Sequence, residues 1–154
     1  MRWLVAAIAL LIAPQAQAIC VLCSCNVDPD PMAFGAFPAL DNVALNGAGN
    51  IKVTCTGVAA LDSLTLRLDG GLHGTVAQRR MAVSGNLLNY NLYRDAGRRQ
   101  IWGTGAGGYA AVVTPNTLGL LSWTSNTPVW GHFIAAPTTP PGSYTDVVTV
   151  TVEW

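Results

Sequence analysis

The residues with the most obvious chemistry are four cysteines, Cys20, Cys23, Cys25 and Cys55. Cys20 and Cys23 have the spacing of a redox pair, and the four thiols together could in principle hold a zinc ion. Redox pairs of this spacing open a helix within a βαβ unit, and no helical pattern follows here. We therefore expect structural disulfides, which are the default in an exported protein.

The connectivity of these cysteines is not settled by the sequence, because four cysteines allow three pairings. A bridge between Cys23 and Cys25 is disfavoured, since alternate residues of an extended strand lie too far apart for relaxed disulfide geometry. We favour a bridge between Cys25 and Cys55. Cys20 and Cys23 are then paired with each other or used differently.

The other polar motifs predict turns rather than catalysis. The glycine-rich segment 103–108 lacks the Lys-Ser/Thr ending of a phosphate-binding loop and precedes no helix, so a hairpin turn is expected. His73 and His132 have no Asp, Glu or Ser at motif spacing, and Asp69 and Asp95 follow apolar runs as turn residues do. We predict that the chain is not an enzyme and needs no metal or cofactor.

The aromatic residues have two interpretations, a carbohydrate-binding platform or the filling of a core that has few other bulky side chains. Trp123 is the residue that separates them, because it lies in a polar segment whose exposure would favour a carbohydrate-binding module. The residues concerned are Trp102, Trp123, Trp130, Trp154, Tyr90, Tyr93, Tyr109 and Tyr144. We favour the core interpretation.

The N-terminal segment predicts export. Arg2 is followed by an apolar run over 3–13 and by the small-residue site Ala16-Gln17-Ala18, which together resemble a secretory signal peptide at 1–18. The apolar run is too short to span a membrane comfortably. We expect one mature domain at 19–154. The whole chain carries eight basic and eight acidic residues with no basic patch, which argues against nucleic-acid binding.

The rest of the chain predicts an all-β sandwich or barrel, because short alternating segments are separated by Gly, Asn and Pro turns. No segment after residue 18 has a helical period. We expect strands at 25–37, 50–56, 64–68, 80–83, 88–93, 101–103, 129–134 and 142–154. The first of these is interrupted by Pro29 and Pro31, which suit an edge strand that switches partner partway. Ile51, Val53 and Cys55 fall on one inward face, and Leu64, Leu66 and Leu68 on another.

The final strand poses a problem of coverage. Over 142–154, Val148, Val150, Val152 and Trp154 share one face, which predicts a strand within a sheet. We expect no later segment to pair with its far edge, and an uncovered long edge promotes association. Either an earlier strand covers this edge or another molecule does, as in a polymer subunit.

Several ordered motifs resemble the spore coat protein U domain family, which includes subunits of archaic chaperone–usher pili. They run through nearly the whole mature chain: Cys25-x-Val27, Met32-Ala33-Phe34-Gly35, Ile51-x-Val53-Thr54-Cys55, Arg80-Met81, Leu88-Asn89-Tyr90-Asn91-Leu92-Tyr93 with Asp95, Trp102-Gly103, Val129-Trp130-Gly131 and Gly142-x-Tyr144-Thr145-Asp146-x-Val148-Thr149-Val150. The resemblance implies an immunoglobulin-like sandwich that lacks its final strand.

In that family a periplasmic chaperone lends the missing strand, and an outer-membrane usher exchanges it for the N-terminal extension of a neighbouring subunit. The resemblance thus implies these three partners, a Cys25–Cys55 bridge and transport from the periplasm to a surface fimbria. It also implies an acceptor groove between the first and last strands, with lining residues Ala33, Phe34, Phe37, Val148, Val150, Val152 and Trp154.

One departure from the family pattern concerns the donor segment. After cleavage behind Ala18, only the six residues 19–24 precede Cys25, a span of about 20 Å that is too short to fill a groove with several pockets. We expect a subunit that accepts a strand but does not give one, as at a fibre tip, with a role in adhesion or biofilm and a possible surface receptor. The alternatives are a self-folding secreted coat protein and a carbohydrate-binding module.

Overall fold

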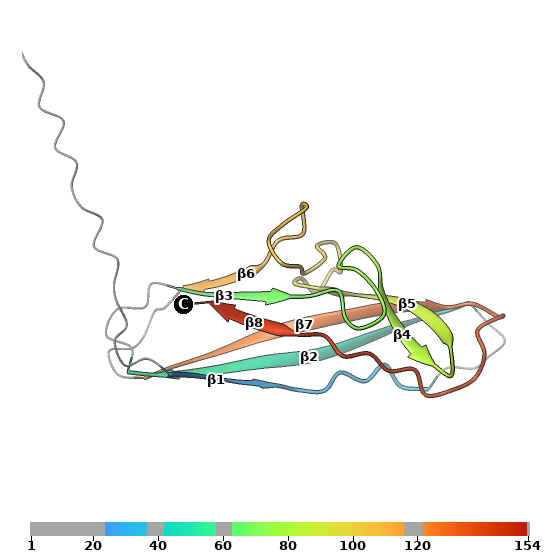
Figure 1. Cartoon of the computed structure of the whole chain (residues 1–154), viewed down its shortest axis with the longest axis horizontal. Coiled ribbons are helices and arrows are strands. Elements are labelled where there is room, and N and C mark those ends of the chain that lie inside the picture. The colour runs from blue at the N-terminus through green and yellow to red at the C-terminus, as the bar shows by residue number, and fades with distance from the viewer. Residues whose placement is uncertain (1–23, 37–41, 58–62, 116–121, 154) are drawn as a thin grey trace, which may run out of the picture.

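A computed structural model describes residues 24–36, 42–57, 63–115 and 122–153. These residues form two antiparallel sheets that face each other, with strand orders β1-β2-β7-β5-β4 and β6-β3-β8 (Figure 1). The strands are β1 (Ser24–Pro29), β2 (Val43–Thr56), β3 (Ser63–Leu68), β4 (Arg79–Val83), β5 (Asn86–Tyr93), β6 (Val112–Pro115), β7 (Ser122–Ala135) and β8 (Val150–Glu153). The predicted all-β sandwich is confirmed. Within the described residues, no helix is long and apolar enough to cross a membrane.

The two longest strands, β2 and β7, have 14 residues each and pair with one another inside the larger sheet. Both extend well beyond the predicted segments 50–56 and 129–134. Glycines and asparagines in β2 and a polar start in β7 resemble turn sequences, but they alternate across a sheet whose outer face meets water. The pairing of β2 with β7 therefore overrides the local turn preference.

The terminal segment departs from the prediction of one long strand over 142–154. Only β8 joins the ladder of β3, whereas Thr145 forms an isolated bridge with Ala82 of β4 in the other sheet. The Ala82 amide donates to the Thr145 carbonyl at 2.9 Å, and the Thr145 amide donates back at 3.1 Å. The segment crosses from one sheet to the other, and the crossing interrupts its hydrogen-bond ladder.

Smaller differences occur elsewhere. The first strand region was predicted over 25–37 with an interruption at Pro29 and Pro31, and β1 does end at Pro29, because these prolines cannot donate to a ladder. No strand resumes over the described residues 31–36. The segment 101–103 is not a strand, although Ile101 forms an isolated bridge with Tyr93. The strand β6 was not predicted.

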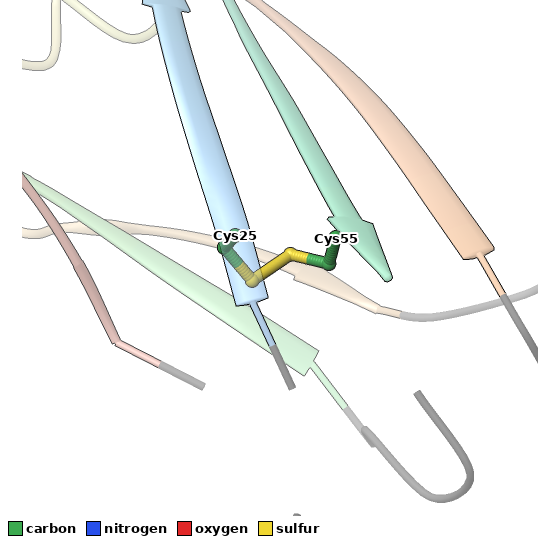
Figure 2. The surroundings of a disulfide bond; sticks show 2 residues. All are labelled: Cys25 and Cys55. Carbon is green, nitrogen blue, oxygen red and sulfur yellow. A yellow bond between two sulfur atoms is a disulfide. The ribbon is translucent and has the colours of Figure 1, made fainter. Parts of the chain in front are cut away.

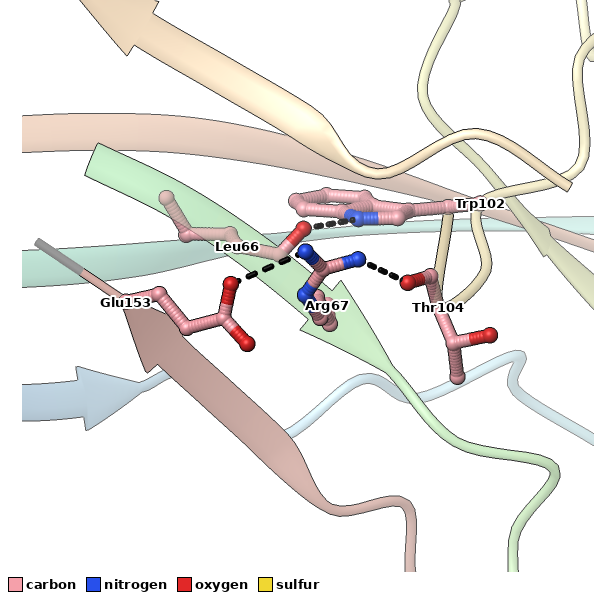
Figure 3. Close-up of polar contacts among 5 residues, drawn as sticks. All are labelled: Leu66, Arg67, Trp102, Thr104 and Glu153. Carbon is pink, nitrogen blue, oxygen red and sulfur yellow. Dashed lines mark hydrogen bonds and ion pairs between the residues drawn. The ribbon is translucent and has the colours of Figure 1, made fainter. Parts of the chain in front are cut away.

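The core confirms the predicted inward faces. Ile51, Val53 and Cys55 are buried on β2, and the three leucines of β3 are buried opposite them. Trp102 is also buried, and its indole N–H donates to the Leu66 carbonyl at 3.0 Å. Figure 3 shows how this bond holds the 101–103 segment against β3.

The outward face of β3 carries an ion pair with the last strand. Arg67 lies 2.9 Å from the Glu153 carboxylate and also donates to the Thr104 carbonyl (Figure 3). The hydrogen bond with Glu153 raises the pKa of Arg67 above its ordinary value and lowers that of Glu153. The pair therefore links β3 and β8 at the surface, in addition to their backbone ladder.

Candidate functional site

An open apolar groove of about 920 Å³ lies between the segment that follows β1 and the segment that precedes β8. We call residues 30–36 the first rim and residues 142–148 the second rim. The floor consists of inward side chains from both sheets and the β4–β5 hairpin. These floor residues are Ile51, Leu68, Met81, Leu88, Tyr90, Leu92, Val129 and Phe133.

The first rim leaves the larger sheet just after β1. The Asp30 amide still donates to the Asn50 carbonyl at 2.8 Å, and no backbone–backbone hydrogen bond within the described chain continues this ladder over 31–36. The change follows from the two prolines at 29 and 31, which lack the N–H that a ladder requires. The first rim therefore runs beside the groove as an irregular segment.

Side chains of the first rim rest on a strip of glycines in β2 and β7. A Cβ atom at Gly131 would lie 2.6 Å from the Phe34 ring, and one at Gly47 would lie 3.0 Å from the Met32 side chain. These glycines permit a close approach that any side chain would prevent. Phe34 also packs edge-on against Phe133, with ring centroids 5.1 Å apart.

The second rim is anchored by Asp146. Its carboxylate accepts a hydrogen bond from the Tyr90 hydroxyl at 2.7 Å and another from the Leu72 amide at 3.0 Å. A Cβ atom at Gly71 would lie 2.8 Å from the Asp146 Cγ atom, so the carboxylate packs tightly against that glycine. Burial, followed by the hydrogen bond to Asp146, raises the pKa of Tyr90 far above its ordinary value. The rim is thereby tied to the groove floor.

A buried arginine, Arg79, joins β4 to β5 and to the segments that contain Asp69 and Trp102. Arg79 is 0 % exposed, and it donates to the Asp69 and Trp102 carbonyls at 2.8 Å each and to Asn91 Oδ1 at 2.6 Å. Burial lowers the pKa of Arg79 below its ordinary value. Because its donors meet carbonyl and amide oxygens, the guanidinium is satisfied without a contacting carboxylate. Sequence reasoning missed this residue, since an arginine beside Arg80 resembles a surface charge.

Asp69, in the turn after β3, is hydrogen-bonded to Thr149, which lies between the second rim and β8. Burial opposes ionisation of this carboxyl, but hydrogen bonds from the Gly71 and Thr149 amides, both 2.9 Å long, lower its pKa overall. The Asp69 amide in turn donates to the Thr149 carbonyl at 3.2 Å. The turn role predicted for Asp69 is confirmed, and the residue also holds the terminal segment.

Parts of both rims have backbone groups without a backbone hydrogen-bond partner. In the described chain, residues 31–36 and 146–148 make no backbone–backbone hydrogen bond, and no described strand pairs with the outer edge of β8. Such groups lose access to water once the groove is covered, and they then require partners. The groove therefore offers an apolar floor flanked by two edges that a further extended strand could pair with.

The residues predicted for an acceptor groove are only partly assembled in the described chain. Ala33, Phe34, Val148 and Val150 line the groove. Val152 is half-buried against the core but is not part of the groove lining. Phe37 and Trp154 lie outside the described residues.

Sequence reasoning did not assign the floor residues of β5 and β7 to the groove. Tyr90 and Leu92 alternate along β5, and Val129 and Phe133 lie on the inward face of β7. That alternation places Tyr90 and Leu92 on the same face of β5. It could not show that a cavity rather than a second sheet lies above them.

The disulfide joins neighbouring strands at the opposite end of the sandwich. Cys25 of β1 and Cys55 of β2 are paired in register and bonded through their sulfurs (Figure 2). Cys20 and Cys23 lie outside the described residues. The four-cysteine zinc alternative is wrong, because two of its ligands are consumed in this bridge. In the described residues, no group of three potential metal ligands occurs.

The exposed-aromatic alternative fails at its deciding residue. Trp123 lies in β7 rather than in a polar loop, and it is 5 % exposed. Trp130 is half-buried beneath the Arg98 guanidinium, which lies 5.9 Å from the ring centroid. Trp123 therefore fills the core and does not form a carbohydrate platform.

The remaining polar candidates behave as turn or surface residues. The 103–108 segment forms a loop in which the Gly105 amide donates to the Tyr109 carbonyl at 2.8 Å. His73 is exposed, and His132 Nδ1 lies 2.8 Å from Asn46 Oδ1 on the sheet surface. Asp95 accepts hydrogen bonds from the backbone amides of its own loop. None of these forms a catalytic arrangement in the described chain.

Comparison with known proteins agrees with this geometry. A search of curated proteins found no significant match. A solved structure with the same fold is that of the CsuC–CsuE chaperone–tip adhesion subunit pre-assembly complex, from the archaic chaperone-usher Csu pili of Acinetobacter baumannii. One of its chains aligns with a TM-score of 0.58 at 22% identity, over 87% of this chain and 40% of that chain. The family model for the Spore Coat Protein U domain matches residues 11–151, and the chain therefore belongs to that family.

Proposed function

We propose that this protein is a structural subunit of a secreted surface fibre of the archaic chaperone–usher type. The observation that carries the proposal is the groove, whose apolar floor lies between two rims with unpaired backbone. A sandwich of this kind is completed by a strand from another molecule. Main-chain hydrogen bonds to the rims provide affinity, and side chains entering the floor provide specificity.

The floor favours an alternating apolar strand as the occupant. Its inward side chains would bury surface against Leu92, Val129 and Phe133, and each fully buried large apolar side chain contributes about 1.5–3 kcal/mol. Several such contacts would offset the entropic cost of ordering both the incoming strand and the rims. An unfilled groove, by contrast, leaves an apolar surface that promotes aggregation.

The proposed partners follow from this incomplete fold. A periplasmic chaperone covers the groove first, and an outer-membrane usher then mediates exchange for the extension of a neighbouring subunit. The solved complex described above supports the first step, because it holds a chaperone together with a tip adhesion subunit. The route requires export through the predicted signal peptide at 1–18, passage through the periplasm and display in a surface fimbria.

A position at the fibre tip is the finer part of the proposal. It rests on cleavage after Ala18, which leaves a short segment before the Cys25–Cys55 bridge ties β1 to β2. Such a segment gives little strand to a neighbour. A tip subunit would carry an adhesive role in surface attachment or biofilm formation through a receptor that the fibre contacts.

Substitution of Val150 tests the groove assignment. Val150 lines the groove and is half-buried, so Val150→Asp places a charge where the incoming strand must bury apolar surface. Thr151→Asp is the matched control, because Thr151 is adjacent, exposed and absent from the groove lining. Each variant is co-expressed in the periplasm with a chaperone of an archaic chaperone–usher system, and the soluble fraction is analysed by size-exclusion chromatography.

We expect the unmodified chain and Thr151→Asp to elute in a one-to-one complex and Val150→Asp to be lost from it. Expression without the chaperone should yield little soluble protein. A chain that is a stable, cooperatively unfolding monomer on its own would contradict the proposal. That result would favour a self-folding secreted coat protein.

A further inference from the structure

A second concavity, of about 280 Å³, lies where two loops meet on the surface. One loop connects β5 to residue 101, and the other follows the glycine-rich segment 103–108. We call this concavity the loop pocket. Its lining residues are Arg94, Arg99, Gln100, Ile101, Gly108, Tyr109 and Ala110, and none of them lines the groove. A ligand in the loop pocket would therefore leave the groove free to be filled.

The loop pocket is lined by two arginines whose side chains form no close polar contact within the described chain. Arg94 and Arg99 are both exposed, and within the described chain neither guanidinium makes a hydrogen bond or an ion pair. Other arginines differ: Arg67 pairs with Glu153, and Arg79 donates to buried carbonyls. Two free guanidinium groups at one concavity create a positive potential there.

The backbone of the first loop is held rigidly by its only carboxylate. Asp95 accepts hydrogen bonds from the Arg99 amide at 3.1 Å and from the Gln100 amide at 2.8 Å. The Arg94 amide donates to the Gln100 carbonyl at 3.0 Å, which closes the loop. Asp95 also attracts the Arg99 charge at longer range. Two arginines against one carboxylate still leave the loop pocket positively charged.

A third arginine of the same loop secures it to the sheet. The Arg98 side chain donates to the Gly131 carbonyl at 3.0 Å and lies over the Trp130 ring. Its backbone has a φ of 54°, in the left-handed region. The Arg98 side chain therefore contacts β7 and does not line the loop pocket. By attaching the loop to the sheet, it fixes the backbone that carries Arg94 and Arg99.

The second loop adds an aromatic ring and a hydroxyl. Tyr109 is half-buried, and its amide donates to the Ala106 carbonyl at 3.1 Å while its carbonyl accepts from Gly105. These bonds fix the backbone and leave the hydroxyl without a hydrogen-bond partner in the described chain. An aromatic ring with a free polar end suits a ligand that has both an apolar face and hydroxyl groups. Gln100 places an amide at the same concavity.

We propose that the loop pocket binds an acidic sugar residue through its carboxylate. Planar guanidinium groups match carboxylate geometry through paired charge-assisted hydrogen bonds. The Tyr109 ring and the Gln100 amide then contact the sugar face and its hydroxyls. The volume lies just below the range of about 300–1,000 Å³ for drug-sized ligands, which suits one sugar unit of a larger glycan. This site goes beyond the proposed groove function and does not depend on it.

Calorimetric titration with D-glucuronate tests the proposal, with D-glucose and inorganic phosphate as comparison probes. The full exported chain is used, together with its chaperone where that complex is the soluble form. We expect saturable binding of glucuronate, and we expect glucose and phosphate to bind at least about tenfold more weakly. A tenfold difference in affinity corresponds to about 1.4 kcal/mol of binding free energy. Equal affinity for glucose, or for phosphate, would overturn the acidic-sugar assignment.

Variants locate the binding. Arg94→Gln and Arg99→Gln should each weaken glucuronate binding about tenfold, because each removes a charge-assisted contact. Arg80→Gln is the matched control, since Arg80 lies outside the loop pocket and donates to Gln78. Tyr109→Phe keeps the ring and should retain most of the affinity, whereas Tyr109→Ala should not. Unchanged affinity in both arginine variants would overturn the proposal.

Discussion

The sandwich has a closed half and an open half that use the same kind of sequence. In the closed half, near the disulfide, β3 covers the larger sheet, and Val53, Leu64 and Leu66 are 0 % exposed. In the open half, Phe34 and Val148 remain half-buried beside the groove. Both halves alternate apolar and polar residues. Alternation thus decides which side chains face inward, but it does not decide whether a second layer covers them.

The difference between the halves arises from the course of the two rims. The prolines at 29 and 31 take the first rim out of the ladder, and the second rim crosses between sheets after Thr145. Neither segment supplies a continuous strand above the floor. The closed half is therefore stabilised by the chain itself, whereas we propose that the open half is stabilised by a partner.

The largest expected contrast comes from equivalent truncations in the two halves. Leu66→Ala should lower the free energy of unfolding by an amount in the upper part of the range of about 2–5 kcal/mol, because it creates a cavity in fully packed surroundings. Val148→Ala removes a half-buried side chain from an open surface and should cost less than about 1 kcal/mol. Chemical denaturation of both variants in the same state of assembly measures the two costs.

The comparison becomes sharper when the groove is filled. In complex with a chaperone, Val148→Ala should lower the free energy of unfolding by more than it does in the free chain. The loss caused by Leu66→Ala should not change. Equal costs for the two truncations in the free chain would mean that the open half is already covered.

The disulfide is the next largest effect and acts on the closed half. Replacing both Cys25 and Cys55 with Ser should destabilise the fold by about 3–4 kcal/mol on the chain-entropy model, since the bridge closes a separation of 30 residues. The unfolding midpoint is measured with and without reductant. Reductant should lower the midpoint of the unmodified chain and leave the double variant unchanged. A variant as stable as the oxidised parent would show that the closed half does not rely on the bridge.

The smallest effect concerns the anchor of the second rim. Tyr90→Phe should cost about 1 kcal/mol at neutral pH, because Asp146 loses its hydroxyl donor at a partly buried site. The folded pKa of Tyr90 is raised above the ordinary value of 10.0, so the unfolded chain loses this proton first. The resulting stability is present below pH 10 and declines as the pH rises above it.

Denaturation at several alkaline pH values tests this coupling. The unmodified chain should lose stability more steeply above pH 10 than Tyr90→Phe does. Parallel pH profiles would indicate that the Tyr90–Asp146 bond does not hold the rim.

The sequence predicted the parts of this protein that depend on local periodicity. The inward faces of β2 and β3 follow from side-chain alternation. Turn residues such as Asp69 and Asp95 were also recognised, because they follow apolar runs. In the structure their carboxylates accept hydrogen bonds from nearby backbone amides. These features extend over a few neighbouring residues, and the sequence displays such features directly.

Only the tertiary structure decided features that depend on distant pairing. Trp123 is buried because β7 continues along β2 through a polar segment, and Arg79 is buried because carbonyls from two other segments surround it. The loop pocket exists because the fold brings together two separate loops, one with Arg94 and the other with Tyr109. Likewise, the 142–153 segment crosses between sheets although its alternation is uninterrupted. Alternation fixes the direction of a side chain, whereas what lies opposite that side chain depends on residues far away in the sequence.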